Sequence, residues 1–145
     1  MRGFTLPVWV AAAAKSAAQV LNGNDFDQQQ KINLSNEEES IVVPVRSASV
    51  LDQCKKAIGI TNCDPGMCLD ITRDLEIWTC FEYVKMDIDF YSEHSHKESW
   101  LRIIPGYGVG KLSLTNDISI SEFARQLLLL NLNSFRRKGY YIKLE

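Results

Sequence analysis

Hydrophobic positions are spaced as in a helix near both ends of the chain and as in strands between them. An apolar run follows Pro7, which suits a first helical turn because its missing N–H would have no partner there, and an Asn-Gly pair ends the run. These signals predict an alanine-rich helix over residues 7–22 that can approach its neighbours closely. Ser119 and Glu122 form a Ser-x-x-Glu capping box, which predicts a second helix over about residues 120–133.

Between the two helices the pattern alternates with a period of two. Residues 31–34 and 40–47 are predicted to form a hairpin around an acidic turn. Residues 76–86 are largely apolar on both faces, which indicates a strand inside a sheet, whereas residues 51–60 fit a strand or a helix. Two further strands are expected at residues 100–104 and 139–145. Strands interleaved with two helices indicate an α+β fold with a mixed sheet, and we expect one domain over residues 1–145.

Composition narrows the functional classes. The chain has 145 residues, 46% of them hydrophobic, so it can form a core without a disulfide or metal. The net charge of −2 argues against nucleic acid as a partner, because phosphate binding calls for a basic excess. The charge is uneven: residues 61–98 hold nine acidic and three basic side chains, and residues 99–145 hold seven basic and three acidic ones.

The N-terminal segment resembles a signal peptide only in part. Arg2 precedes an apolar run, but the run over residues 6–14 is too short to span a bilayer. The residues after it continue the helical pattern instead of opening a cleavage site. We therefore expect a cytoplasmic protein that does not enter membranes.

The cysteines give a weak signal for metal binding. They lack the close pairs of structural zinc sites, although His94 and His96 would add ligands. Free, largely buried thiols in a reducing compartment are the expected state, and no protein-bound metal is expected. The four positions are Cys54, Cys63, Cys68 and Cys80.

Three segments carry residues suited to binding. The loop over residues 105–110 has glycines at alternate positions, which either let the backbone approach a ligand or only connect two strands. Asp64 and Asp70 either act on a ligand as a carboxylate pair or satisfy backbone N–H groups in turns. The basic run over residues 136–138 either offsets the charge of a helix end or binds a ligand with several carboxylates.

Several short motifs follow one another along the chain in a fixed order. The first is a Gly-aromatic-Thr signature before an alanine-rich helix that contains a lysine. Next comes a glycine, acidic and threonine loop before a Glu-Ile strand start, and the last is a Gly-x-Gly-Val-Gly loop. The residues are Gly3-Phe4-Thr5, Lys15, Gly59-Ile60-Thr61, Asp64-Pro65-Gly66, Asp70-Ile71-Thr72, Glu76-Ile77 and Gly106-Tyr107-Gly108-Val109-Gly110. In these motifs and their order the chain resembles one family, the cobalt-precorrin-5B (C-1)-methyltransferases of anaerobic cobalamin biosynthesis.

The chain also departs from the family pattern. Leu6-Pro7-Val8-Trp9 stands where most members have Thr-Gly-Thr-Cys, and one branch of the family tolerates Leu-Pro-Val there. Met67 and Cys68 replace acidic residues, and Pro105 and Tyr107 replace glycine and glutamate. Members are considerably longer, so the resemblance implies the N-terminal domain of a two-domain enzyme, without its C-terminal domain.

The resemblance implies transfer of a methyl group from S-adenosylmethionine to carbon C-1 of a cobalt corrinoid. Holding the two reactants in line is the main task of the protein and supplies on the order of 7–11 kcal/mol. Acidic and aromatic groups at Asp64, Asp70 and Tyr107 would favour the sulfonium cation. The corrinoid has peripheral carboxylates, for which Arg102, Arg125 and the run over residues 136–138 are candidate clamps. The expected binding residues are Thr5, Asp64, Gly66, Asp70, Thr72, Gly106, Gly108, Gly110, Arg136 and Arg137.

Two other functions stay open on the sequence. A non-catalytic tetrapyrrole-binding or assembly domain derived from the enzyme would account for the acidic residues lost at Met67 and Cys68. A small zinc-binding interaction protein would instead use the cysteines. No residue is identified as a catalytic base, and a homo-oligomer remains open.

Overall fold

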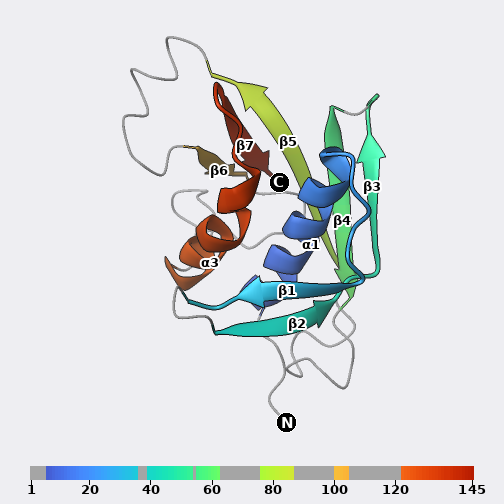
Figure 1. Ribbon diagram of the computed structural model, residues 1–145, viewed down its shortest axis with the longest axis vertical. Helices are drawn as coiled ribbons and strands as arrows, with labels where there is room; N and C mark the ends of the chain where they lie inside the picture. Colours follow the sequence, from blue (N-terminus) through green and yellow to red (C-terminus); the bar gives the residue numbers. More distant parts are fainter. Residues whose placement is uncertain (1–5, 36–38, 54, 63–75, 87–99, 105–121) are drawn as a thin grey trace, which may run out of the picture.

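The computed structural model describes residues 6–35, 39–53, 55–62, 76–86, 100–104 and 122–145 (Figure 1). Both predicted helices are confirmed, and residues 139–145 form a strand as expected. The helices are α1 (Leu6–Leu21) and α3 (Glu122–Leu132), followed by the short 3₁₀ helix η2 (Asn133–Phe135). The strands are β1 (Gln29–Asn33), β2 (Ser40–Pro44), β3 (Ser47–Leu51), β4 (Lys56–Asn62), β5 (Glu76–Lys85), β6 (Leu101–Ile103) and β7 (Tyr140–Leu144).

The main sheet has five strands in the order β3-β4-β5-β7-β6, and β1 and β2 form a separate hairpin. Neighbouring strands are antiparallel except β6 and β7, which are parallel. The sheet is therefore mixed, and the α+β fold class is confirmed. β5 has a partner on each side, as its sequence predicted, and β7 lies between β5 and β6 although it comes after both in the chain.

Two strand predictions change in detail. The strand predicted over residues 40–47 is divided, because β2 ends at Pro44 and β3 begins at Ser47 in the other sheet. Proline offers no N–H to a ladder, and the next two residues turn to different partners: Val45 N donates to the Gln28 oxygen, and Arg46 N to the Ile60 oxygen. Between β3 and β4 the chain turns through two residues with positive φ, Asp52 (50°) and Gln53 (55°). The ambiguous stretch over residues 51–60 is thus a strand end, a tight turn and a second strand.

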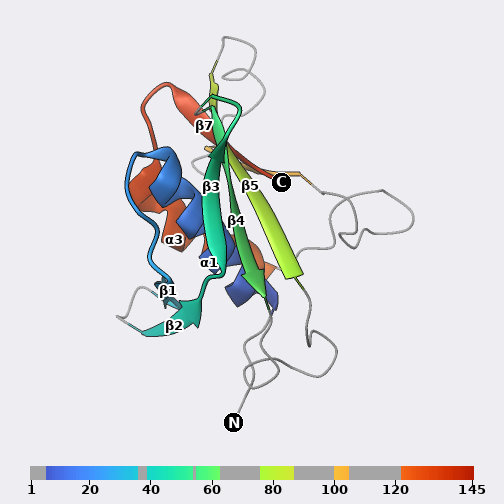
Figure 2. The ribbon, with the colours of Figure 1, turned by 90° about the vertical axis from the view of Figure 1, so that its right-hand side faces the viewer.

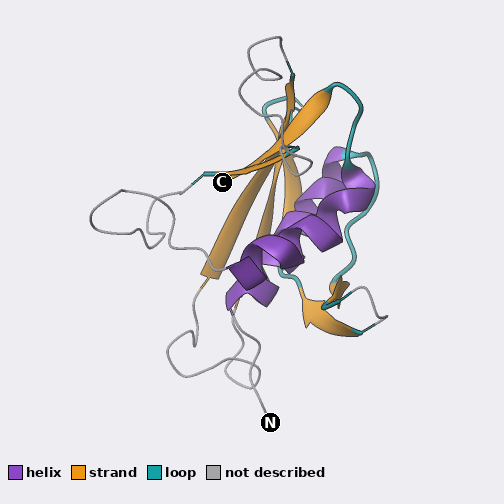
Figure 3. Cartoon of the chain, turned by 90° about the vertical axis from the view of Figure 1, so that its left-hand side faces the viewer, coloured by secondary structure: helices purple, strands orange, loops and turns teal. Residues whose placement is uncertain are grey.

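Helix α1 is buried on nearly all sides. Both helices lie on one face of the main sheet, and the β1–β2 hairpin packs on the side of α1 away from it (Figures 2 and 3). Six alanines of α1 have no exposed surface, and Ser16 is equally buried with its Oγ donating to the Ala12 oxygen (2.9 Å). The alanine content therefore serves close packing, as the sequence predicted. The six are Ala11, Ala12, Ala13, Ala14, Ala17 and Ala18.

Helix α1 lies very close to the sheet at Gly59 in β4. A Cβ atom there would lie 1.9 Å from the Ala13 carbonyl oxygen and 2.7 Å from the Ala13 carbonyl carbon. One turn nearer the start of the helix, Thr61 Oγ1 donates to the Trp9 carbonyl oxygen (3.2 Å). A glycine and a buried hydroxyl thus set the distance between α1 and the sheet.

A buried amide fixes α3 against the hairpin. The Asn131 side chain is 4% exposed; its Oδ1 accepts from Asn33 N (2.8 Å) and its Nδ2 donates to the Asn33 oxygen (2.9 Å) and to the Leu127 oxygen (2.8 Å). The side chain therefore pairs with β1 as a neighbouring strand would. Through this contact and through α1, the hairpin is fixed to both helices, which lie between it and the sheet.

The two faces of β5 differ in burial. On the side toward α1, Phe81 has no exposed surface and Thr79 is 3% exposed. On the opposite side, Trp78 is 60% exposed and Cys80 is only half-buried. The apolar residues on both faces of this strand thus do not indicate that both faces are covered. Cys80 is a free thiol of intermediate burial, in keeping with the expectation of free, largely buried thiols.

Candidate functional site

The predicted binding residues divide into two groups. Arg136 and Arg137 are described by the structure. The other eight lie outside the described residues: Thr5, Asp64, Gly66, Asp70, Thr72, Gly106, Gly108 and Gly110. The same holds for Tyr107, Met67, the two histidines and the other three cysteines.

The described residues that adjoin the segments with the predicted binding residues lie toward one end of the main sheet. β4 ends at Asn62 directly opposite Glu76, where β5 begins, and we call this the loop end of the sheet. The first turn of α1 lies at the same end, because its Trp9 oxygen binds Thr61 of β4. β6 runs parallel to β7 and antiparallel to β5, so it also runs toward the loop end. The segments 1–5, 63–75 and 105–121 therefore join the described chain at this end or in its direction.

The two arginines lie on opposite flanks of β7. The Arg136 guanidinium stands over the Trp100 ring, with its carbon 5.0 Å from the ring centre, and the Arg137 guanidinium stands 4.0 Å above the Tyr83 ring. Trp100 directly precedes β6 and Tyr83 belongs to β5, which are the strands on either side of β7. Adjacent residues in the basic run thus point to separate places.

Arg137 belongs to a hydrogen-bond network that joins three parts of the fold. Its Nη2 donates to Asn22 Oδ1 (2.9 Å), and Asn22 Nδ2 donates to the Tyr83 hydroxyl oxygen (3.0 Å) and to the Ala18 oxygen (2.7 Å). The Tyr83 hydroxyl donates in turn to the Phe135 carbonyl oxygen. The network ties the end of α1, the last residues of β5 and the residues before β7 together, which gives Arg137 a structural role.

This network lies away from the loop end. Tyr83 is seven residues along β5 from Glu76, a separation of about 23 Å at roughly 3.3 Å per residue. No spacing of motifs along the chain indicated this separation. The structure thus does not gather Arg137 with the residues that adjoin the predicted loops.

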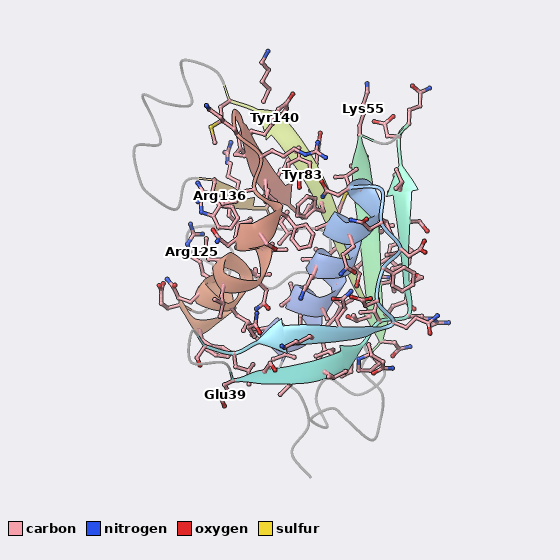
Figure 4. All side chains as sticks on the ribbon, in the orientation of Figure 1. Glu39, Lys55, Tyr83, Arg125, Arg136 and Tyr140 are labelled. Atoms are coloured by element: carbon pink, nitrogen blue, oxygen red, sulfur yellow. The ribbon has the colours of Figure 1, made fainter. Side chains whose placement is uncertain are left out.

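The other two arginines that the sequence offered as clamps, Arg125 and Arg102, are also among the described residues. Figure 4 shows Arg125 of α3 and Arg136 on the same flank of the molecule, with Tyr83 between β5 and α1. Arg136 is exposed and Arg125 is half-buried. Arg102 is exposed on β6, beside Lys143 of β7. A guanidinium that stacks by its face on a ring keeps its in-plane N–H groups for a carboxylate, so Arg136 is suited to bind one.

Lys15, the lysine of the alanine-rich helix, reaches the hairpin. Its Nζ donates to the Lys31 carbonyl oxygen (2.8 Å). Burial lowers the pKa of Lys15, and nearby Lys31 lowers it further, whereas Asp27 raises it. This lysine therefore connects α1 to β1, and its charge is partly desolvated.

Metal and membrane sites receive no support from the described part of the chain. Within it, no three His, Cys, Asp or Glu side chains are grouped so that they could hold a metal ion. Neither α1 nor α3 is long and apolar enough to cross a membrane.

The Cys80 thiol is the one described cysteine side chain. Burial raises its pKa, nearby carboxylates raise it further, and nearby lysines lower it, with burial as the largest effect.

The residues that sequence reasoning missed are the aromatic and amide partners of the arginines. Tyr83, Trp100 and Asn22 lie far from residues 136 and 137 in the chain, and they meet them only through the order of the sheet. No local signal identifies such contacts. The position of β7 between β5 and β6 is what brings them together.

Comparison with known proteins gives a consistent result. The model of the CbiD family matches residues 1–143. A cobalt-precorrin-5B C(1)-methyltransferase of Prochlorococcus marinus strain SARG is 62% identical over 145 residues, all of this chain and 38% of the relative. A protein of the same name from strain NATL2A is 44% identical over 148 residues and is covered to 38%. Another, from Synechococcus sp. strain CC9605, is 45% identical over 130 residues, 90% of this chain and 32% of the relative. The chain thus spans about 38% of the length of its first curated relatives, and no solved structure matches it.

Proposed function

The chain belongs to the CbiD family, and on this premise we propose that it forms the N-terminal part of a methyltransferase that acts on C-1 of cobalt-precorrin-5B in cobalamin biosynthesis. The observation that carries the proposal is the 62% identity over the full chain to a relative of that name. S-adenosylmethionine is the methyl donor in this proposal, and the cobalt corrinoid is the substrate. Cobalt enters with the substrate and not as a metal of the protein.

The loop end of the sheet is the proposed place for the reacting groups. The sulfonium methyl group is already electrophilic, so the protein has to hold it in line with the ring carbon. Support comes from the described residues: β4 ends here, and β5 and α1 begin here, next to segments 1–5 and 63–75. Asp64, Asp70 and Tyr107 remain our candidates for binding the sulfonium cation, together with Thr5, Gly66, Thr72 and the glycines at 106, 108 and 110.

The arginines receive different tasks in this proposal. Arg136, with Arg125 on the same flank of the molecule, is the candidate clamp for peripheral carboxylates of the corrinoid. Arg137 already donates to Asn22 and covers Tyr83, so it serves the fold more than the substrate. Exchanging either residue for alanine separates these roles, because a clamp affects affinity and a structural residue affects stability.

The test joins this chain in frame to the C-terminal part of the strain SARG relative. The joined protein is incubated with cobalt-precorrin-5B and S-adenosylmethionine that carries a labelled methyl group, and label in the corrinoid is measured. We expect transfer, a loss of S-adenosylmethionine affinity in Asp70→Asn, and a loss of corrinoid affinity of at least tenfold in Arg136→Ala. Lys55→Ala, in the exposed turn before β4, is the matched control and keeps both.

The alternative, a non-catalytic tetrapyrrole-binding domain, predicts another result. The joined protein would then bind the corrinoid without transferring label at any concentration of S-adenosylmethionine. Unchanged S-adenosylmethionine affinity in Asp70→Asn would remove that residue from the proposed site. Unchanged corrinoid affinity in Arg136→Ala would remove the clamp.

A further inference from the structure

The face of the main sheet that points away from α1 carries rows of apolar side chains, and we call it the outer sheet face. Gly59 and Thr61 point toward α1, so the residues between and beside them in β4 point outward. The register places outward-pointing residues of neighbouring strands side by side. The pairs are Ile60 with Trp78, Ile58 with Cys80, and Val84 with Tyr141.

A charged row crosses the same face between the apolar pairs. Lys56 is paired with Glu82, Glu82 with Lys143, and Lys143 with Arg102, so this row runs from β4 to β6. Glu82 and Lys143 form an ion pair (3.9 Å). Three cations against one carboxylate leave the row basic. A surface that fits this face is therefore apolar with a stripe of carboxylates.

The helices do not cover the outer sheet face. Figure 2 shows α1 and α3 behind the sheet, with β3, β4 and β5 toward the viewer. Trp78, on this face two residues after the start of β5, is 60% exposed, although an indole side chain gains much from burial. Exposed apolar patches of this kind mark interaction surfaces in soluble proteins.

We propose that the outer sheet face is the docking surface for the C-terminal part that full-length members of the family carry. The curated relatives are more than twice as long as this chain, which covers 38% of them. The strands of the sheet offer roughly 500 Å² of face at about 3.3 Å per residue and 4.8 Å between strands, which matches one side of an ordinary interface between domains. The inference concerns assembly and does not depend on the methyl-transfer proposal.

The position where β7 ends is consistent with the C-terminal part as the occupant of the outer sheet face. Glu145 exchanges two backbone hydrogen bonds with Cys80 (2.9 and 3.0 Å), so it lies in the row next to Trp78. In a longer relative, the residues that follow this position would continue from β7 beside the row of Trp78, whose side chain lies on the outer sheet face. A short connection is then enough to place the C-terminal part on it.

The tryptophans provide a direct test. The chain has three, of which Trp9 is 0%, Trp100 6% and Trp78 60% exposed. Acrylamide quenching is measured on this chain joined to the C-terminal part of the strain SARG relative, and on its Trp78→Phe variant, and the difference isolates Trp78. We expect Trp78 to be as protected as the two buried tryptophans. Quenching of Trp78 at the rate of an exposed indole in the joined protein would overturn the proposal.

A second measurement asks whether the contact holds the two parts together. Trp78→Asp and Lys143→Glu should each increase the rate of limited proteolysis between the parts at least tenfold in the joined protein. The matched control is Phe123→Asp on α3, where the side chain is 51% exposed but lies on the other side of the sheet. Unchanged proteolysis in both face variants, or an equal increase in the control, would refute the docking surface. Protection of Trp78 that grows with protein concentration would also refute it, because the occupant would then be a second copy.

Discussion

Gly59→Ala should destabilise this protein more than the addition of one methyl group usually does, because the new Cβ meets the backbone of Ala13 in α1. The new Cβ would lie 1.9 Å from the Ala13 carbonyl oxygen and 3.2 Å from its Cα, whereas ordinary contacts of this kind are about 3.5 Å. Either α1 or β4 must therefore move by more than 1 Å, and no side chain can yield instead. Overpacking in a core costs about 1–3 kcal/mol, and we expect the upper end here.

The assay is thermal and urea unfolding of the chain and its variants, followed by circular dichroism. A loss of about 3 kcal/mol corresponds to roughly 6–12 °C in Tm for a domain near this size. Gly139→Ala is the matched control: Gly139 has φ +84° and nothing within 4 Å of the added methyl group, so only backbone strain of about 1–2 kcal/mol applies.

The double variant Ala13→Gly with Gly59→Ala sharpens the test. It should be no more stable than Gly59→Ala, because the conflicting atoms of residue 13 belong to the backbone and remain. If Gly59→Ala lost no more stability than Gly139→Ala, or if Ala13→Gly restored it, the close approach of α1 to β4 would not be the reason for a glycine at this position.

Asn131→Leu should cost about 2–3 kcal/mol in urea unfolding, because it leaves the part-buried backbone N–H and C=O of Asn33 without their side-chain partner; a loss below about 1 kcal/mol would contradict this. Arg137→Ala should lower the free energy of unfolding by about 1–2 kcal/mol through its contacts with Tyr83 and Asn22, and an unchanged urea midpoint would count against the network. The lowered pKa of Lys15 means that the unfolded chain holds this proton more tightly, so stability should rise as pH increases from the lowered pKa toward about 10.4. Lys15→Met should remove that part of the rise, and identical pH profiles would refute the assignment. The raised pKa of the Cys80 thiol should slow its alkylation by iodoacetamide at about pH 8 relative to a free cysteine, measured with the other cysteines replaced by serine; equal rates would exclude the effect of burial.

Local signals in the sequence were enough to predict the helices and most of the strands. Pro7 and the Asn-Gly pair bound the first helix because backbone geometry at a helix end depends on neighbouring residues only. The apolar pattern of β5 likewise required a strand with partners on both sides, which it has. The alanine content of α1 predicted close packing, and the approach at Gly59 confirms it.

Contacts between distant segments could not be derived in the same way. The break at Pro44 depends on the chain changing sheets, and the exposure of Trp78 depends on which face the helices choose. The separate directions of Arg136 and Arg137 follow from the strand order, which no spacing in the sequence encodes. The family resemblance supplied the candidate site, and most of its residues remain predictions.

The place of β7 in the sheet sets an order for the folding of a growing chain. About 55 residues separate the end of β5 from the start of β7, and a ribosome adds them in roughly 3–10 s. During this time β5 has a free edge where β7 will pair, and β6 lacks the neighbour that it will have in the finished sheet. Free strand edges of this kind invite pairing with other chains. Synthesis that stalls within this interval would therefore leave a nascent chain prone to aggregation. Chaperones that bind nascent chains would be needed most at that stage.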